Sequence, residues 1–314
     1  MFALLETAME LGLIYGLTVL ALFLSYSMLG VCDLSTDGCF TLGAAVGSVT
    51  LLAGHPLLSL PAAMAVGALS GFMTAALQTR LGVDPLLSGI IVNTGLYSVN
   101  IAVMGGSAQL NLNRSNTLFT LTREPLAYFL PAGLARTVLL LLLIVLTAVL
   151  LSLFLRTRLG LAIRATGNNP DMVRSSSINP AFTITVGLCL AGALTGLSGC
   201  LLAQYQRSAE INMGSGILTV ALASLLIGRA LVPRGNIPLR AAGAVAGAFL
   251  FRLVYALALQ LRMPAYMLKL TSAVIVALTI ALPYLKNRFP CLSSAKRPKE
   301  GKNYAESLSY LQNL

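Results

Sequence analysis

Tryptophan is absent from the 314 residues, histidine occurs once, and only 10% of the side chains are charged. Hydrophobic residues make up 57% of the chain, and the mean hydropathy is +0.84. A soluble domain of this length cannot cover its surface with so few charges, which excludes that class. Without tryptophan, tyrosines and long basic side chains must occupy the membrane–water interface. The composition therefore predicts an integral membrane protein.

The sequence also lacks the motifs from which catalytic and metal sites are built. His55 has no carboxylates or thiols around it at ligand spacing, and no cysteine belongs to a CxxC pair. No phosphate-binding loop, nucleotide fingerprint or paired-carboxylate motif occurs. We predict no enzyme activity, no cofactor and no metal. The cysteines are interpreted as free thiols packed among helices: Cys32, Cys39, Cys189, Cys200 and Cys291.

Long apolar runs dominate the chain. A membrane-spanning helix needs about 20 apolar residues, and the second and seventh runs are short by that measure. The prediction is an all-α membrane protein, a polytopic helical bundle of about nine transmembrane helices in residues 1–285. Small residues near 43–48, 191–199 and 241–248 favour close helix packing. The runs fall near residues 8–31, 39–54, 57–79, 85–104, 133–155, 181–205, 214–232, 239–260 and 265–285.

The basic residues are distributed unevenly between the connections. Most of the 21 lysines and arginines fall in loop 156–180, near Arg80, between Arg229 and Arg240, and in the tail, 286–314. These regions share one side if the runs cross in turn, and an excess of basic residues marks the cytoplasmic side. The N-terminus would then lie outside. The net charge of +11 thus reflects membrane topology and contact with lipid, and indicates no nucleic-acid partner.

Two apolar runs follow polar interruptions that resemble each other. "CDLSTDGCFTLGAAVGS" covers residues 32–48, and "EINMGSGILTVALAS" covers residues 210–224. Interrupted segments at corresponding places in two halves are typical of inverted repeats around a central path. The alternative is two ordinary capped loops. The candidates for lining the path are Asp33, Ser35, Asp37, Gly38 and Asn212.

The fourth run carries polar residues inside an apolar segment. Asn93, Tyr97 and Asn100 are spaced i, i+4 and i+7, so they share one helical face. Such groups form hydrogen bonds between helices or line a cavity, and both options stay open. Arg252, near the middle of the eighth run, allows snorkelling, an internal ion pair or a functional role.

Loop 156–180 is the most polar part of the middle of the chain. We expect a last membrane turn at 156–159, a helix over 161–167, an Asn-Asn-Pro break and a second helix over 171–177. Pro170 suits the first position of that second helix, with Asn169 as its N-cap.

This loop carries a resemblance to a known family. "GLAIRATGNNPDMVRSSSIN" is similar to the cytoplasmic coupling region of ABC importer permeases of the ribose/branched-chain amino acid type. "CDLSTDGCFTLGAAV" resembles the segment after their first span, and the likeness covers residues 8–285. "DLSTDG" with "NLNRSNTLF" looks most like permeases assigned to tryptophan or tyrosine uptake.

The resemblance implies a multi-pass protein of the bacterial cytoplasmic membrane and several partners. These are cytoplasmic ABC ATPase subunits, an extracytoplasmic solute-binding lipoprotein and a second permease subunit in a homodimer. It also implies that Asp33, Leu34, Ser35 and Gly38 lie beside the path. The residues to which it assigns ATPase coupling are Gly160, Arg164, Ala165, Gly167, Asn168, Met172 and Val173.

Other functions stay open at this point. An ion-coupled secondary transporter would need membrane-embedded acids, for which Asp33 and Asp37 are the nearby pair. A membrane-embedded enzyme would need a clustered site, and a channel-like scaffold would conduct without ATPase partners. The solute is expected to be an aromatic or branched-chain amino acid, with a sugar or a nucleoside as alternatives.

Overall fold

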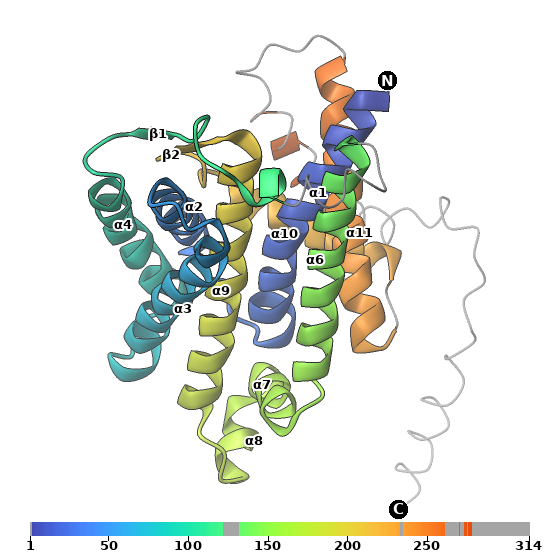
Figure 1. The fold of residues 1–314 in the computed structure, drawn as a ribbon. Helices are drawn as coiled ribbons and strands as arrows, with labels where there is room; N and C mark the ends of the chain where they lie inside the picture. Colours follow the sequence, from blue (N-terminus) through green and yellow to red (C-terminus); the bar gives the residue numbers. More distant parts are fainter. Residues whose placement is uncertain are drawn as a thin grey trace, which may run out of the picture.

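A computed structural model of the protein describes residues 2–121, 132–232 and 235–260, together with residues 270, 273, 274, 276 and 277. Helices make up most of this part and form one bundle (Figure 1). In chain order the elements are α1 (Phe2–Leu22), η1 (Phe23–Met28), α2 (Thr36–Leu52), α3 (Pro56–Arg80), α4 (Pro85–Val103), β1 (Gln109–Asn111), α6 (Ala132–Phe154), α7 (Arg158–Asn168), α8 (Pro170–Ser175), α9 (Pro180–Gln206), β2 (Ser208–Glu210), α10 (Ile217–Leu231) and α11 (Ile237–Gln260).

Six helices of the described residues are long and apolar enough to cross a membrane. They comprise η1 with most of α1, then α3, α4, α6, α9 and α11, while α2 and α10 are apolar but shorter. The first eight predicted runs each coincide with a helix. The ninth run, 265–285, falls largely outside the described residues, so the predicted count of nine crossings stays a prediction.

Helices α1 and α9 form the centre of the bundle. In their most apolar windows 72% and 78% of the residues are buried, compared with 22% in α6, which lies at the periphery. Small residues bring the central helices together, as the sequence predicted. A side chain at Gly43 of α2 would meet Gly196 of α9, and one at Gly67 of α3 would meet Gly192.

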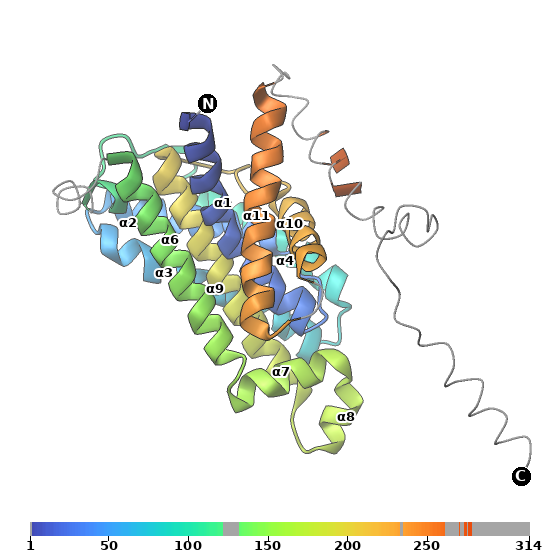
Figure 2. The ribbon, with the colours of Figure 1, turned by 90° about the vertical axis from the view of Figure 1, so that its right-hand side faces the viewer.

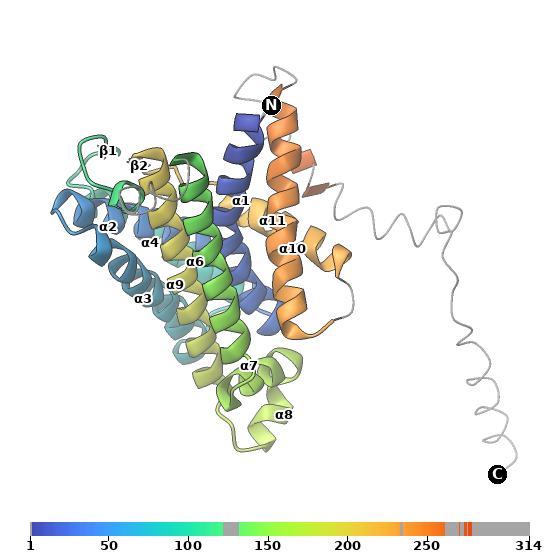
Figure 3. The ribbon, with the colours of Figure 1, turned by 45° about the vertical axis from the view of Figure 1, so that its right-hand side comes forward.

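The bundle has two distinct ends. Helices α7 and α8 lie together at one end (Figures 1 and 2), and β1 and β2 lie at the opposite end with the N-terminus (Figure 3). The strands pair antiparallel, with Leu110 opposite Ala209. The sequence did not predict this small sheet. It joins the loop after α4 to the turn after α9, so it ties together the two halves of the chain.

Candidate functional site

Helix α2 begins inside the bundle, beside the middle of α4. Gly38, in its first turn, accepts a hydrogen bond on its carbonyl oxygen from Asn100 Nδ2 at 3.2 Å. A side chain at Gly38 would lie 2.7 Å from Asn93 Oδ1, so the glycine leaves room for the Asn93 side chain of α4. With 17 residues α2 is about 25 Å long, which is shorter than a typical hydrocarbon core. The polar segment before α2 therefore enters the bundle as non-helical chain.

Helix α10 begins at the same place, because Asp37 of α2 binds its N-terminus. Asp37 Oδ2 accepts from Gly216 N at 2.9 Å, and Oδ1 accepts from Leu218 N at 2.8 Å. Thr41, one turn further along α2, accepts from Gly214 N at 3.1 Å. A carboxylate at a helix N-terminus satisfies free N–H groups and opposes the positive end of the helix dipole. The two predicted interruptions thus meet each other through these contacts.

A polar pocket of roughly 440 Å³ opens where the two interrupted helices meet α4. It holds six of the nine residues that the sequence proposed for the path, while Asp33, Leu34 and Ser35 lie outside its lining. Reasoning from sequence missed the other five residues of the lining. A spacing of four residues, which places side chains on one helical face, could have indicated three of them, since Thr41 follows Asp37 by four and Ser98 follows Thr94 by four. The lining consists of Asp37, Gly38, Thr41, Asn93, Thr94, Tyr97, Ser98, Asn100, Ile211, Asn212 and Ser215.

The three polar residues predicted to share a face of α4 all line this pocket, but to different degrees. Asn100 is 1% exposed, Asn93 is half-buried, and Tyr97 is 51% exposed. Asn100 also satisfies the alternative interpretation, since its amide donates to α2. Asn100 therefore both joins two helices and borders a cavity.

Asp33 and Ser35 lie just before α2 and are buried against neighbouring chain. Asp33 Oδ1 accepts from Ser35 N at 2.8 Å, and its carbonyl oxygen accepts from Thr36 Oγ1 at 2.7 Å. Ser35 Oγ accepts from Thr74 Oγ1 of α3 at 3.1 Å. These contacts hold the segment that leads into α2. The sequence's alternative of a capped loop is met only in part, because Ser35 occupies the N-cap position of α2 but its side chain makes no cap hydrogen bond.

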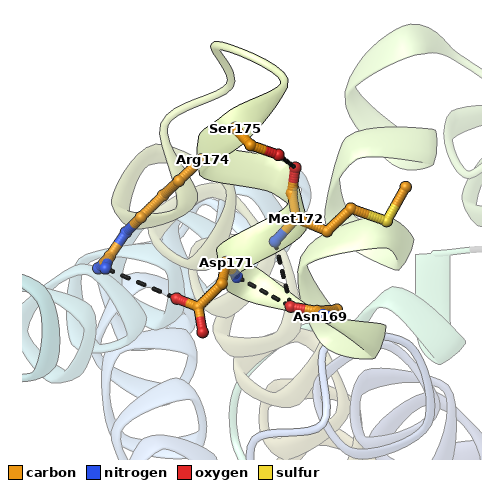
Figure 4. Close-up of polar contacts among 5 residues, drawn as sticks. All are labelled: Asn169, Asp171, Met172, Arg174 and Ser175. Atoms are coloured by element: carbon orange, nitrogen blue, oxygen red, sulfur yellow. Dashed lines mark hydrogen bonds and ion pairs between the residues drawn. The ribbon is translucent and has the colours of Figure 1, made fainter.

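The second predicted site, loop 156–180, folds into two short helices at the end of the bundle. Asn169 Oδ1 accepts from Asp171 N at 3.0 Å and from Met172 N at 3.1 Å, so the predicted cap with Pro170 in the first turn is confirmed (Figure 4). The expectation of a membrane turn at 156–159 was wrong. Helix α7 already starts at Arg158, because Thr157 Oγ1 caps it by accepting from Gly160 N.

The proposed coupling residues divide into buried and exposed groups. A side chain at Gly160 would meet Leu155, and one at Gly167 would meet the carbonyl of Met28, so both glycines permit close packing. Val173 is 3% exposed, whereas Met172 is 65% exposed and points away from its own helix in Figure 4. Met172 is therefore the side chain best placed for a partner. The remaining residues are half-buried (Arg164 and Ala165) or exposed (Asn168).

Arg252 of α11 lies among aromatic rings. Its guanidinium carbon is 3.7 Å from the centroid of the Tyr15 ring of α1 and 5.4 Å from that of Tyr255. Such cation–π contacts stabilise a buried arginine. Among the roles that the sequence left open for Arg252, this arrangement is nearest to the internal ion pair, with an aromatic ring in place of the carboxylate.

A membrane bundle with two helices interrupted at one depth and a polar pocket at the interruption is characteristic of transport proteins. Residues 4–283 match the family model described as "Branched-chain amino acid transport system / permease component". The chain belongs to this family of ABC transporter permeases. It is a multi-pass protein of the bacterial cell membrane.

Curated relatives show how wide the family is. The chain is 30% identical to a tyrosine transport system permease protein of Clostridioides difficile, over 88% of this chain and 90% of the relative. It is 28% identical to a probable branched-chain amino acid transport permease protein of Methanocaldococcus jannaschii, over 69% and 61%. It is 27% identical to a ribose import permease protein of Escherichia coli, over 62% and 60%. No solved structure matches the chain.

Proposed function

We propose that this permease forms the path for an amino acid, aromatic or branched-chain, in an ATP-driven importer. The observation that carries the proposal is the pocket where α2, α4 and the start of α10 meet. Two of its exposed polar residues, Thr94 and Ser98, lie on α4, a helix apolar enough to span the membrane. Polar groups at this depth face water, solute or protein and not lipid. The relative named for tyrosine transport supports the choice of solute.

A sugar is the second candidate solute. The relative named for ribose import supports it, and hydroxyl and amide groups of the pocket also suit a sugar. The direct experiment reconstitutes the complete transporter and measures ATP-dependent uptake of labelled L-tyrosine, L-leucine and D-ribose. We expect uptake of an amino acid. Saturable uptake of ribose alone would contradict the proposal, and uptake that ignores ATP but follows an ion gradient would favour a secondary transporter.

ATP would be hydrolysed on a partner, since the chain has no phosphate-binding loop. The proposed partners are two cytoplasmic ATPase subunits, a lipid-anchored binding protein and a second copy of the permease. Nucleotide-driven closure of the ATPases would move α7 and α8 as a rigid unit. The bundle would then switch between outward- and inward-open states around the pocket.

The exposed side chain of Met172 provides a sharp test of ATPase docking. We expect Met172→Asp to lower co-purification of the ATPase and uptake at least about tenfold, because a charge replaces an apolar anchor. The fold should persist, since Met172 is 65% exposed. Ser175→Asp, in the same short helix and also exposed, is the matched control for added charge. Normal ATPase recovery with Met172→Asp would contradict this docking surface.

A further inference from the structure

The polar pocket is bordered by a buried hydrogen-bond acceptor that no described residue of the chain engages. Asn100 is 1% exposed, and its Nδ2 donates to the carbonyl oxygen of Gly38. Its Oδ1 has no hydrogen-bond partner within the described part of the chain. An unsatisfied buried oxygen is costly, so it is normally met by a donor. Asn100 is one of the residues that line the pocket, so a donor that enters the pocket comes next to this side chain.

The position where an anion would bind is already filled. The Asp37 carboxylate accepts from Gly216 and Leu218 at the start of α10, and Thr41 accepts from Gly214. A solute carboxylate placed there would find those N–H groups occupied and a like charge beside it. Among the described residues that line the pocket, none is lysine, arginine or histidine.

The neighbouring hydroxyl groups also present oxygen lone pairs. Thr94 Oγ1 donates to the carbonyl oxygen of Ile90 at 2.9 Å, and Thr41 Oγ1 donates to that of Asp37 at 3.1 Å. Their hydrogens are therefore engaged within their own helices. The oxygen of Thr94 is left as an acceptor, whereas the oxygen of Thr41 already accepts from Gly214 N. The ring of Tyr97 lines the same pocket and can stack against a cation.

We infer that the pocket contacts the ammonium group of the solute, with Asn100 Oδ1 as acceptor and Asp37 as counter-charge, and that the solute carboxylate is bound elsewhere. The inference rests on the proposed function, an importer of an amino acid, and deepens it. An ammonium group supplies three donors and a positive charge, whereas a sugar supplies hydroxyl donors without the charge.

Two probes that each carry one end of an aromatic amino acid test this inference. Tyramine has the ammonium group alone, and 3-(4-hydroxyphenyl)propionate has the carboxylate alone. Their binding to the full-length chain in lipid nanodiscs, without a binding protein, is measured by saturation-transfer NMR. We expect the propionate to bind at least about tenfold more weakly than tyramine, because it lacks the charged hydrogen bond that the ammonium group donates. Equal or stronger binding of the propionate, or binding of neither probe, would overturn the inference.

Variants at Asn100 then assign the contact to this residue. Asn100→Leu should weaken tyramine at least about tenfold, whereas Asn100→Asp keeps an acceptor and should bind tyramine at least as tightly as the wild type. Ser88→Ala, on the same helix but outside the pocket, is the control for folding. Wild-type affinity in a monodisperse Asn100→Leu protein overturns the assignment. If Asn100→Leu does not fold, loss of tyramine binding in Asn100→Asp overturns the assignment instead.

Failure of the inference and failure of the proposed function look different. ATP-dependent uptake of an amino acid together with equal binding of the two probes removes only the ammonium contact. Uptake of ribose but no amino acid removes the proposed solute, whatever the probes do.

Discussion

The two interrupted segments, 32–48 and 210–224, look alike in sequence but make opposite contributions to the junction. The first supplies acceptors, the carboxylate of Asp37 and the hydroxyl of Thr41. The second supplies backbone donors from Gly214, Gly216 and Leu218. Corresponding places in the two halves are therefore complementary and not equivalent.

The difference begins with how each helix starts. The segment before α2 is held from within by Asp33, whose carboxylate accepts from Ser35 N. Helix α10 starts after Gly216, which has a left-handed backbone (φ 86°) and no side chain to act as a cap. Free N–H groups within a membrane must find acceptors, so α10 depends on Asp37 from the other half.

Removing the Asp37 carboxylate should cause the largest loss of stability at the junction of the two segments. Asp37→Leu leaves the N–H groups of Gly216 and Leu218 without their acceptor, and we expect a loss of about 3–5 kcal/mol in the free energy of unfolding. Unfolding by SDS titration measures this loss, and uptake should disappear with it. Asp37→Asn keeps one amide oxygen as an acceptor and should lose less. Equal stability of Asp37→Leu and wild type would show that the junction does not depend on the carboxylate.

Pushing the two segments apart with a bulky side chain should cause an intermediate loss of stability. A side chain at Gly214 would meet the carbonyl oxygen of Asp37 and Thr41 Oγ1, so Gly214→Val must push the turn away from α2. We expect a loss of about 2–3 kcal/mol, as for an overpacked core site. Gly95→Ala is the control, because nothing lies within 4 Å of its added carbon. Equal thermal midpoints for the two variants would contradict the close approach.

Removing the single hydroxyl contact between the two segments should cause the smallest loss of stability. Thr41→Val keeps the shape of the side chain but removes the acceptor for Gly214 N, which now lies at 3.1 Å. We expect a loss of about 1 kcal/mol in the free energy of unfolding. Hydrogen exchange of the Gly214 amide, followed by mass spectrometry, should become faster. Unchanged exchange at that amide would show that another group protects it.

The contacts of the junction illustrate how far sequence reasoning reached. Polar residues inside apolar runs indicated Asp37, Asn93, Asn100 and Asn212, and the structure brings all four to one pocket. Spacing within one helix predicted the shared face of α4, because a helical period relates residues three to four apart. No local pattern connects Asp37 with Leu218, since these residues are 181 positions apart. The same limit applies to Arg252 and Tyr15, whose contact joins α11 to α1.

The sequence by itself determined the membrane class, the apolar runs, the Asn169 cap in loop 156–180 and the positions of both interruptions. These properties depend on composition, period and neighbours along the chain, which can be read without a fold. Only the tertiary structure decided that Asp37 caps the other half of the chain, and that Asp33 and Ser35 do not line the pocket. It also decided that one oxygen of Asn100 has no hydrogen-bond partner among the described residues. Those outcomes depend on distances between helices, which are set when small residues bring α2, α3 and α9 into contact.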